Sequence, residues 1–270
     1  MSETIQRPLS PVLYFPHGGG PLPLLGDPGH RNIVAFLETI APTLGKPSAI
    51  LVISAHWEES VPTITGGAHP PLFYDYYGFP EESYQITYPA PGEPALAREI
   101  RRLLKEGGID ARLDDQRGFD HGLFVPLKII YPDARIPCVQ LSLVEGLDPA
   151  THIAVGKALA SLRSQDVLVL GSGFSFHNLR AFFSSHPGQH DPGNVAFQQW
   201  LIDACTAEGL SSTGREQKLI AWENAPSARY CHPREEHLLP LHVCYGIAGS
   251  PAKVVFDGEV LGKRSVALAW

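Results

Sequence analysis

The sequence predicts an α/β fold: a single-domain, layered α/β/α sandwich around a mostly parallel or mixed central sheet. Short apolar runs typical of strands alternate with longer segments of helical periodicity. The run Ala-Ile-Leu-Val-Ile at 49–53 is continuously apolar, as expected of a strand covered on both faces. With 270 residues, 44% of them hydrophobic, the chain can bury one full core. We therefore expect a single domain over 1–270, with residues 1–10 as an N-terminal extension.

Each element follows from its pattern and its flanking turn residues. The segment 95–105 has helical spacing, and Gly107-Gly108 ends it. The predicted strands are the apolar runs 11–15, 48–54, 61–65, 109–113, 136–143, 166–171, 252–257 and 264–269. The predicted helices are 30–42, 94–107, 122–131, 149–164, 194–208, 215–222 and 235–248.

The stretch 66–93 interrupts this alternation, because it is rich in proline, glycine and aromatic residues. A loop this long in a compact domain is usually functional or disordered, and its aromatic content argues against disorder. Two interpretations stay open: the loop walls a pocket for a flat ligand, or it simply covers one face of the sheet. In the first, Tyr74, Tyr77 and Phe79 are the candidate ligand contacts. Residues 183–193 are expected to form an exposed connection.

The composition excludes several classes of protein. A net charge of −7 and the lack of a Lys/Arg-rich run give no footprint for nucleic acid or an anionic membrane. The N-terminus lacks a signal-peptide pattern, and no apolar stretch is long enough to cross a bilayer. The four cysteines form no Cys-x-x-Cys pair, which argues against a disulfide framework and a thiolate zinc site. We expect a cytoplasmic protein with reduced thiols.

Four histidines lie where apolar strands end or a predicted helix begins. His17, His56 and His177 follow strand-like runs, and His237 lies at the opening of the predicted helix 235–248. In open α/β sheets ligands collect at the carboxyl ends of strands, so these side chains can converge in one crevice. Neutral imidazole is the commonest metal ligand and suits zinc or iron. Each histidine could instead be a hydrogen-bonded structural residue, but their shared placement favours a mononuclear metal enzyme.

A fifth histidine, His121, lies in Phe-Asp-His-Gly just before the predicted helix 122–131. In one interpretation Asp120 caps that helix and His121 faces solvent. In the other, His121 binds ligand or handles protons beside the metal. The residues alone leave both open.

Several familiar motifs fail to match. The three glycines at 18–20 do not form a Gly-x-Gly-x-x-Gly turn, and Pro21 and Pro23 would disrupt the helix that must follow it. The spacing of His232 and His237 differs from that of the His-Glu-x-x-His zinc helix. The chain also has no phosphate-binding loop and no Gly-x-Ser-x-Gly elbow.

An ordered set of motifs nevertheless resembles a known family. In chain order they are Phe-Pro-His-Gly-Gly-Gly, Val-Ile-Ser-Ala-His-Trp, Pro-Pro-Leu-Phe-Tyr-Asp-Tyr-Tyr-Gly-Phe-Pro, Tyr-Pro-Ala-Pro-Gly, Gly-Phe-Asp-His-Gly, Val-Gln-Leu-Ser, Gly-Ser-Gly-Phe-Ser-Phe-His-Asn-Leu and Arg-Glu-Glu-His-Leu-Leu-Pro-Leu. The set resembles the class III extradiol ring-cleavage dioxygenases of the LigB-like superfamily, most closely the DOPA 4,5-dioxygenase-like branch. The resemblance runs from about residue 11 to the C-terminus.

This resemblance implies a single catalytic domain with a non-haem Fe(II) site held by His17, His56 and His237. It implies that His177 is the acid/base, and that His121 hydrogen-bonds the substrate or bound oxygen. Zn(II) can occupy such a site in purified protein. The implied substrates are a small aromatic diol and O2, cleaved in the extradiol (meta) manner. Other branches use two histidines and a glutamate, so Glu236 remains an alternative to His237.

The sequence leaves the identity of the diol open. A carboxylate on it would need a basic partner, for which Arg229, Arg234 and Arg180 are candidates. Two other functions are compatible with the same residues: a zinc-dependent hydrolase on the same histidines, and a non-catalytic metal-binding relative. Retention of all five histidines favours the dioxygenase, and the oligomeric state cannot be inferred.

Overall fold

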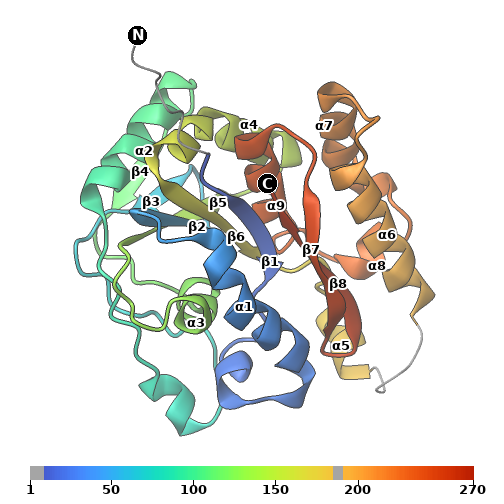
Figure 1. Ribbon diagram of the computed structural model, residues 1–270, viewed down its shortest axis with the longest axis horizontal. Helices are drawn as coiled ribbons and strands as arrows, with labels where there is room; N and C mark the ends of the chain where they lie inside the picture. The colour runs from blue at the N-terminus through green and yellow to red at the C-terminus, as the bar shows by residue number, and fades with distance from the viewer. Residues whose placement is uncertain (1–8, 185–190) are drawn as a thin grey trace.

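The computed structural model describes residues 9–184 and 191–270, which form one eight-stranded sheet between two layers of helices (Figure 1). The strand order is β4-β3-β5-β2-β6-β1-β8-β7. The strands are β1 (Val12–Pro16), β2 (Ala49–Glu59), β3 (Thr63–Thr65), β4 (Arg112–Asp114), β5 (Cys138–Val144), β6 (Val167–Gly173), β7 (Lys253–Val260) and β8 (Lys263–Ala269). Each lies within a few residues of its predicted position, except that β2 continues to Glu59 rather than ending at residue 54, so His56 lies within this strand and not after it.

The sheet is mixed, with a parallel centre and antiparallel pairs toward its edges. Strands β5, β2, β6 and β1 run parallel. β3 is antiparallel to β5, although parallel to β4, and β8 is antiparallel to both β1 and β7. The parallel centre brings the carboxyl ends of β1, β2 and β6 to one edge, where the sequence places its histidines. The predicted α/β sandwich is therefore confirmed.

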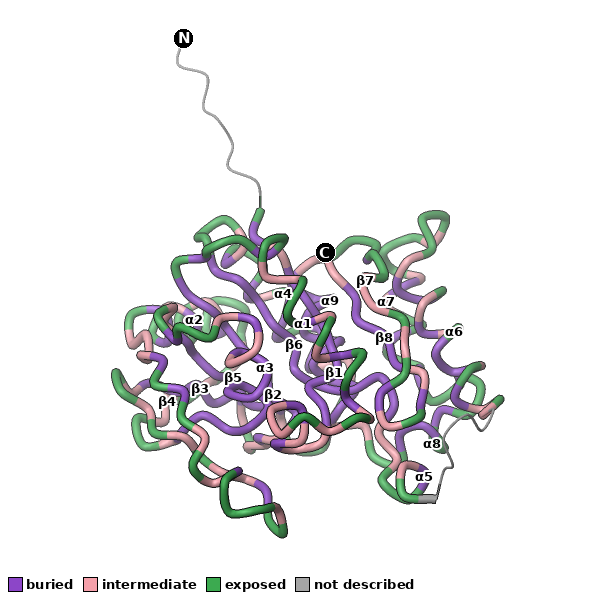
Figure 2. The backbone as a smooth tube through the Cα atoms, turned by 60° about the horizontal axis from the view of Figure 1, so that its bottom comes forward, coloured by how far each residue is buried: buried purple, intermediate pink, exposed green. Residues whose placement is uncertain are grey.

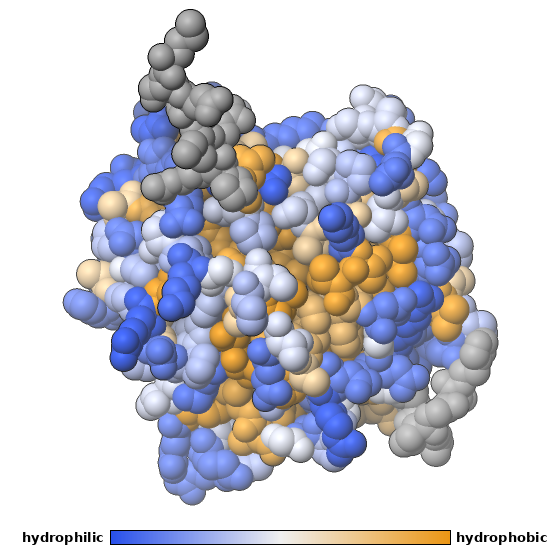
Figure 3. Space-filling model, viewed as in Figure 1, coloured by the Kyte–Doolittle hydropathy of each residue, from blue (hydrophilic) through white to orange (hydrophobic). Residues whose placement is uncertain are grey.

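The helices cover both faces of the sheet. They are α1 (Arg31–Leu44), α2 (Pro94–Glu106), α3 (His121–Ile130), α4 (Pro149–Ala158), α5 (Leu179–Ser184), α6 (Pro192–Thr206), α7 (Ser212–Ile220), α8 (Ala228–Cys231) and α9 (Leu239–Ala248). Helices α1 and α3 pack on one face, and α2, α4 and α9 on the other. Figure 3 shows hydrophobic residues at the surface in the middle of the viewed face, with hydrophilic residues around them.

Strand β2 shows how the two layers bury the sheet. Its side chains alternate between two hydrophobic clusters: Ile50 and Val52 face the α1 and α3 layer, whereas Leu51 and Ile53 face the opposite layer. All four are at most 1% exposed. The central strands are buried along most of their length (Figure 2). The continuous apolar run thus has the cause predicted for it, which is burial on both faces.

The helix predictions differ from the structure in four elements. The predicted helix 149–164 changes at Leu159 into the 3-10 helix Ala160–Gln165. Helix α9 begins at Leu239 rather than near residue 235, because Pro240 in its first turn fits a helix start. Helices α5 and α8 span only six and four residues, too short to give periodicity.

Two predicted segments extend beyond the described residues. Of the predicted extension 1–10, the structure describes Leu9 and Ser10, and the backbone amide of Ser10 donates to the carbonyl of Arg163. Of the predicted connection 183–193, α5 ends at Ser184, α6 begins at Pro192, and residues 185–190 lie outside the described part. Within the described ranges, no helix is long and apolar enough to cross a membrane. All four cysteines are buried free thiols.

Candidate metal centre and active site

The carboxyl-terminal edge of the sheet brings four of the predicted histidines together. His17 directly follows β1, His56 lies within the distal half of β2, and His177 lies four residues beyond β6. His237 lies in the turn 236–238 before α9, which corrects the prediction that it opens the helix. The crevice predicted from strand ends therefore exists, although one of its histidines comes from a turn.

Backbone hydrogen bonds hold these segments side by side. The amide of His17 donates to the carbonyl of Gly173 (3.1 Å), which ties the end of β1 to β6. The carbonyl of His237 accepts from the amide of Phe174 (2.9 Å) and from the hydroxyl of Tyr14 (3.0 Å). The two contacts anchor the turn to β6 and β1, so His237 has a fixed position although it lies outside regular structure.

The glycine after His17 allows the chain to turn away from the site. Gly18 has φ of +91°, a left-handed conformation that glycine adopts without strain. A Cβ atom there would lie 2.5 Å from Pro23 and 2.9 Å from the ring of His30. This part of the three-glycine run therefore has a structural cause and is not a nucleotide-binding turn.

One nitrogen from each of His17, His56 and His237 lies within 4.8 Å of the others. The Nε2 atoms of His17 and His56 are 2.9 Å apart. Two nitrogens bound at right angles to one ion, each about 2.1 Å from it, lie about 3.0 Å apart. The observed spacing of this pair fits a shared metal ion.

The remaining contacts of the three rings indicate which nitrogen carries the proton. The hydroxyl of Ser172 donates to the carbonyl of Gly122 (2.5 Å), so toward His17 it accepts, from Nδ1–H at 3.0 Å. Nδ1 of His237 lies 2.9 Å from Oε1 of Glu236, and Nδ1 of His56 lies 3.6 Å from Oδ2 of Asp75. With the proton on Nδ1, each Nε2 keeps its lone pair free. Such outer contacts are typical of metal-binding histidines.

Burial keeps the three imidazoles neutral. Loss of solvent lowers the pKa of His17, His56 and His237 well below the usual value, and the neighbouring histidines lower it further. Neutral rings that direct lone pairs at one another repel, and a cation among them relieves that repulsion. The donor set therefore fits a divalent metal of the zinc or iron type.

His177 lies against this cluster. Its ring stacks on that of His237, with centroids 3.4 Å apart and an interplanar angle of 18°. Its Nδ1 lies 3.1 Å from Oε1 of Glu236, the same oxygen that His237 faces. Its backbone amide donates to the carbonyl of Cys231 (2.9 Å), which fixes its position. The ring thus lines the cavity with its Nδ1 already engaged.

Glu236 lies on the Nδ1 side of His237. Its Oε1 faces both His237 and His177, and its Oε2 lies 3.5 Å from the guanidinium of Arg234. A carboxylate in this position orients the two rings. Its geometry is that of a supporting group, because His237 is the residue that has a ring nitrogen within 4.8 Å of one nitrogen each of His17 and His56.

His121 is buried, and the carboxylate of Asp75 contacts its backbone amide and its Nδ1. Oδ1 of Asp75 accepts from the backbone amide of His121 (2.9 Å) and lies 2.8 Å from its Nδ1. The rings of His121 and His56 are 3.9 Å apart. Burial raises the pKa of Asp75, but the hydrogen bond from His121 and the nearby imidazoles outweigh this and hold it below its usual value. The sequence interpretation in which His121 faces solvent is therefore wrong.

Asp120 does not cap α3 with its side chain, which corrects the second half of that interpretation. Its buried carboxylate instead accepts from the hydroxyl of Ser54 (2.8 Å) and from the amide of Gln140. Ser54 in turn accepts from the backbone amide of His56 (3.2 Å). Burial raises the pKa of Asp120, and the charge of Asp75 adds to the rise. Asp120 therefore braces the strand that carries His56.

The five histidines line one cavity of about 810 Å³. The stretch 66–93, called the aromatic loop from here on, contributes Tyr76 and Phe79 to the cavity lining. Their rings meet edge to face with centroids 5.5 Å apart. Tyr76 also lies 5.8 Å from the ring of His121. The loop thus forms a wall of this cavity, which favours the first of its two sequence interpretations.

Two of the predicted aromatic contacts lie elsewhere. Tyr77 is 92% exposed and does not line the cavity. Tyr74 packs edge to face against Phe124 and donates its hydroxyl to the carbonyl of Ile86 (2.7 Å). The sequence pattern identified the loop but not Tyr76, because aromatic residues in irregular backbone have no periodicity that tells which side chain points inward. Asp75 could not be identified either, because it lies in the same irregular backbone.

The three candidate arginines differ in their partners. Arg229 pairs with Glu223 and Glu235. Arg234 lines the cavity and makes two contacts of 2.6 Å with the carboxylate of Glu58. Arg180 is exposed and lines an adjoining cavity.

The carboxyl edge of the parallel-centred sheet gathers three imidazoles whose spacing fits a shared metal ion, together with two further histidines, and this arrangement is typical of a metal-dependent enzyme of the α/β class. Residues 13–267 match the family model described as the catalytic LigB subunit of aromatic ring-opening dioxygenase, and the chain belongs to this family. It is an extradiol aromatic ring-opening dioxygenase, which acts on an aromatic substrate with O2 and uses a catalytic metal.

Curated relatives and a solved structure agree with this assignment. The chain is 40% identical to "Dioxygenase tasH" of Hapsidospora irregularis over 97% of this chain and 86% of that protein. It is 42% identical to "4,5-DOPA dioxygenase extradiol" of Portulaca grandiflora over 82% of each chain. The crystal structure of an uncharacterized protein from Escherichia coli K12 superposes with a TM-score of 0.77 at 30% identity, covering 96% of this chain and 99% of that one.

Proposed function

We propose that the enzyme is a single catalytic domain that cleaves a DOPA-like catechol in the extradiol manner with Fe(II) as its working metal. The observation that carries this proposal is the cluster of His17, His56 and His237, in which one ring nitrogen of each residue lies within 4.8 Å of the others, in the cavity that all five histidines line. The printed names of several curated relatives, which are called 4,5-DOPA dioxygenases, support the substrate class.

The metal would be held by His17, His56 and His237, with Ser172, Asp75 and Glu236 orienting the three rings. Bound Fe(II) supplies the redox chemistry that allows O2 to react with a closed-shell catechol. Three protein ligands leave room for the substrate on the cavity side. Zinc binds the same donors without offering that redox change, so a zinc-loaded protein would be inactive.

His177 is the proposed acid/base. Its Nδ1 faces Oε1 of Glu236, which leaves Nε2 to take the second phenolic proton of the catechol and to return it as the ring opens. The stacking of His177 on His237 keeps this nitrogen close to the metal ligands. The carboxylate of Glu236 also stabilises the imidazolium that forms, because the two opposite charges lie within contact distance.

His121 is the proposed substrate-orienting residue. With Nδ1 held by Asp75, its Nε2 is free to hydrogen-bond a catechol oxygen or O2. Tyr76 and Phe79 provide an aromatic wall against which the ring packs, and both help to exclude water. Of the aromatic contacts predicted from sequence, Phe79 is retained in this proposal, and Tyr76 takes the place of Tyr74 and Tyr77.

Metal exchange with a catechol panel tests the proposal. Metal-free protein is reconstituted anaerobically with Fe(II) or with Zn(II) and mixed with DOPA, protocatechuate or catechol in an oxygen electrode. We expect O2 uptake with the iron protein and DOPA, and none with the zinc protein. Equal product formation with zinc, or under anaerobic conditions, would contradict a dioxygenase mechanism and support a hydrolase.

A further inference from the structure

A second cavity of about 510 Å³ continues outward from the metal centre. It lies between the segment 177–180 and the turn 233–236, and it shares His177, Arg234 and Glu236 with the main cavity. Because the two cavities share these lining residues, this space is within reach of a substituent on a ring that is bound over the histidine cluster. The shape of the site therefore provides separate space for the ring and for a tail.

The charged groups around this extension are paired, with one exception. Arg234 is neutralised and held in place by the two contacts with Glu58. Among the residues that the structure describes, Arg180 has no ion pair, and it is exposed. A guanidinium with no carboxylate of its own has donors available for a carboxylate on a ligand.

The backbone that carries Arg180 is held firmly beside the catalytic histidine. Asn178 donates through its side-chain amide to the carbonyl of Tyr230 (2.7 Å) and accepts from the backbone amide of Ala181 (3.1 Å). His177 is tied to the carbonyl of Cys231. Arg180 is therefore presented from a fixed segment three residues beyond the acid/base, at the outer end of the cavity.

We propose that this extension is the subsite for the substrate's tail and that Arg180 binds a carboxylate on it. The inference rests on the proposed function, because it takes the substrate to be a catechol. It adds where the carboxylate of such a DOPA-like catechol binds and which residue selects for it. Arg180 is thus a specificity-determining residue rather than a catalytic one.

The test compares two substrates that differ only in the carboxylate. DOPA and dopamine share the catechol ring and the ammonium group, but dopamine lacks the carboxylate. In Arg180→Gln, kcat/KM for DOPA is expected to fall by at least about tenfold, as for loss of a hydrogen bond to a charged group. The value for dopamine should stay unchanged. Arg180→Lys should recover part of the loss, since it keeps the charge but not the planar fork.

The matched control is Arg98→Gln, an exposed arginine on α2 far from the metal centre in the fold, for which both substrates should behave as in the wild type. An equal loss for DOPA and dopamine in Arg180→Gln would overturn the proposal in favour of a structural role. Unchanged DOPA turnover would overturn it as well.

A binding measurement separates this proposal from the proposed function. Calorimetry of the iron-loaded protein under anaerobic conditions gives Kd for DOPA and dopamine without turnover. If no catechol is cleaved but DOPA binds more tightly than dopamine, and Arg180→Gln removes the difference, the subsite stands and the reaction proposal fails. Equal affinities of the wild type for the two compounds would overturn the subsite.

Discussion

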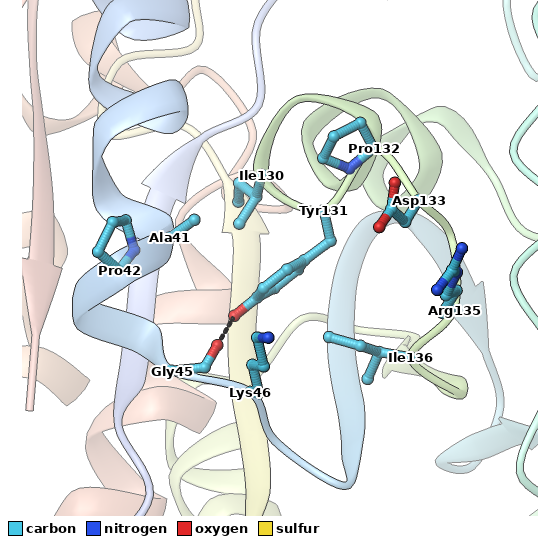
Figure 4. Close-up of a pocket in the computed structure, with 10 residues that line it drawn as sticks. All are labelled: Ala41, Pro42, Gly45, Lys46, Ile130, Tyr131, Pro132, Asp133, Arg135 and Ile136. Carbon is cyan, nitrogen blue, oxygen red and sulfur yellow. Dashed lines mark hydrogen bonds between the residues drawn. The ribbon is translucent and has the colours of Figure 1, made fainter.

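Two cavities at opposite edges of the sheet differ in what their polar groups face. The cavity at the carboxyl ends of the strands is lined by five histidines, three of which have one ring nitrogen each within 4.8 Å of the others. The other, of about 580 Å³, lies where α1 and α3 end and β2 and β5 begin. Figure 4 shows its one central polar contact, the hydroxyl of Tyr131 donating to the carbonyl of Gly45 (3.1 Å).

The difference shows that cavity size alone does not identify a site. The groove around Tyr131 is walled by apolar side chains, with Lys46, Asp133 and Arg135 exposed at its rim. The half-exposed hydroxyl of Tyr131 holds two loops together through its bond to Gly45. At the opposite edge, the fold places free lone pairs where the parallel strands end, as expected for ligand sites in α/β sheets.

The largest expected effect is on metal binding. His56→Ala removes one of the three facing nitrogens, and the protein should lose most of its bound metal and essentially all activity. Metal content by mass spectrometry after reconstitution and desalting checks this. His69→Ala, an exposed histidine on the aromatic loop, is the matched control and should stay fully loaded. Full metal content in the His56, His17 and His237 variants alike would refute the proposed ligands.

Loss of the acid/base should separate chemistry from metal binding. His177→Ala is expected to lower kcat by about 10²- to 10⁴-fold, the usual contribution of a positioned general acid or base, while most of the metal stays bound. Single-turnover kinetics combined with metal analysis measures both. If His177→Ala lost metal as completely as His56→Ala, His177 would be a fourth ligand instead.

A smaller effect is expected at the supporting carboxylate. Asp75→Asn keeps the shape but weakens the hold on Nδ1 of His121 and His56. Metal affinity or activity should fall by about 10- to 100-fold, as for other groups that orient metal-binding histidines. A chelator competition assay measures the affinity, and kcat and KM are determined on the loaded enzyme. Wild-type values for both would show that Asp75 only anchors its loop.

Buried histidines outside the site should affect stability rather than activity. Burial lowers the pKa of His242 to about 4, and its Nε2 lies 2.9 Å from the carbonyl of Leu219. The unfolded chain, with a pKa of about 6.5, binds this proton more readily, so stability is present above that pH and is lost as pH falls toward 4. Chemical unfolding at several pH values should show a shallower loss in His242→Gln. An identical pH profile would contradict this.

The smallest effect is expected in the groove of Figure 4. Tyr131→Phe removes the hydrogen bond to Gly45 and should lower the free energy of unfolding by about 1 kcal/mol. Because this groove is remote from the chemistry, kcat and KM should not change. A clear loss of turnover would contradict this, because it would mean that a change in the groove around Tyr131 affects the histidine cavity at the other end of the strands.

The sequence predicted the sheet and the histidine cluster because both depend on strong local patterns. Buried strands leave continuous apolar runs, and a histidine after such a run lies at a predictable edge. The role of a histidine, however, depends on which groups its two ring nitrogens contact. Both ring nitrogens of His30 have partners, Asp27 and the amide of Gly19, whereas the Nε2 atoms of His17 and His56 face each other. No sequence pattern predicts whether a histidine nitrogen has a hydrogen-bond partner or faces another histidine.

The groups that support the cluster could not be predicted in the same way. Asp75 lies far from His56 and His121 in sequence, and Ser172 lies 155 positions from His17. Asp120 occupies a position typical of a helix cap, yet its carboxylate faces Ser54 and Gln140. Such contacts depend on how the strands and the aromatic loop pack, which local propensity does not determine.

Labelled oxygen tests the central claim most directly. The iron-loaded enzyme is incubated with DOPA under ¹⁸O₂, and the aldehyde product is reduced with borohydride as it forms, so that its oxygen cannot exchange with water. The account predicts a ring broken beside the diol, with both atoms of the labelled O2 in the product. Cleavage between the two hydroxyl-bearing carbons, or a product without label, would contradict extradiol cleavage at this histidine cluster.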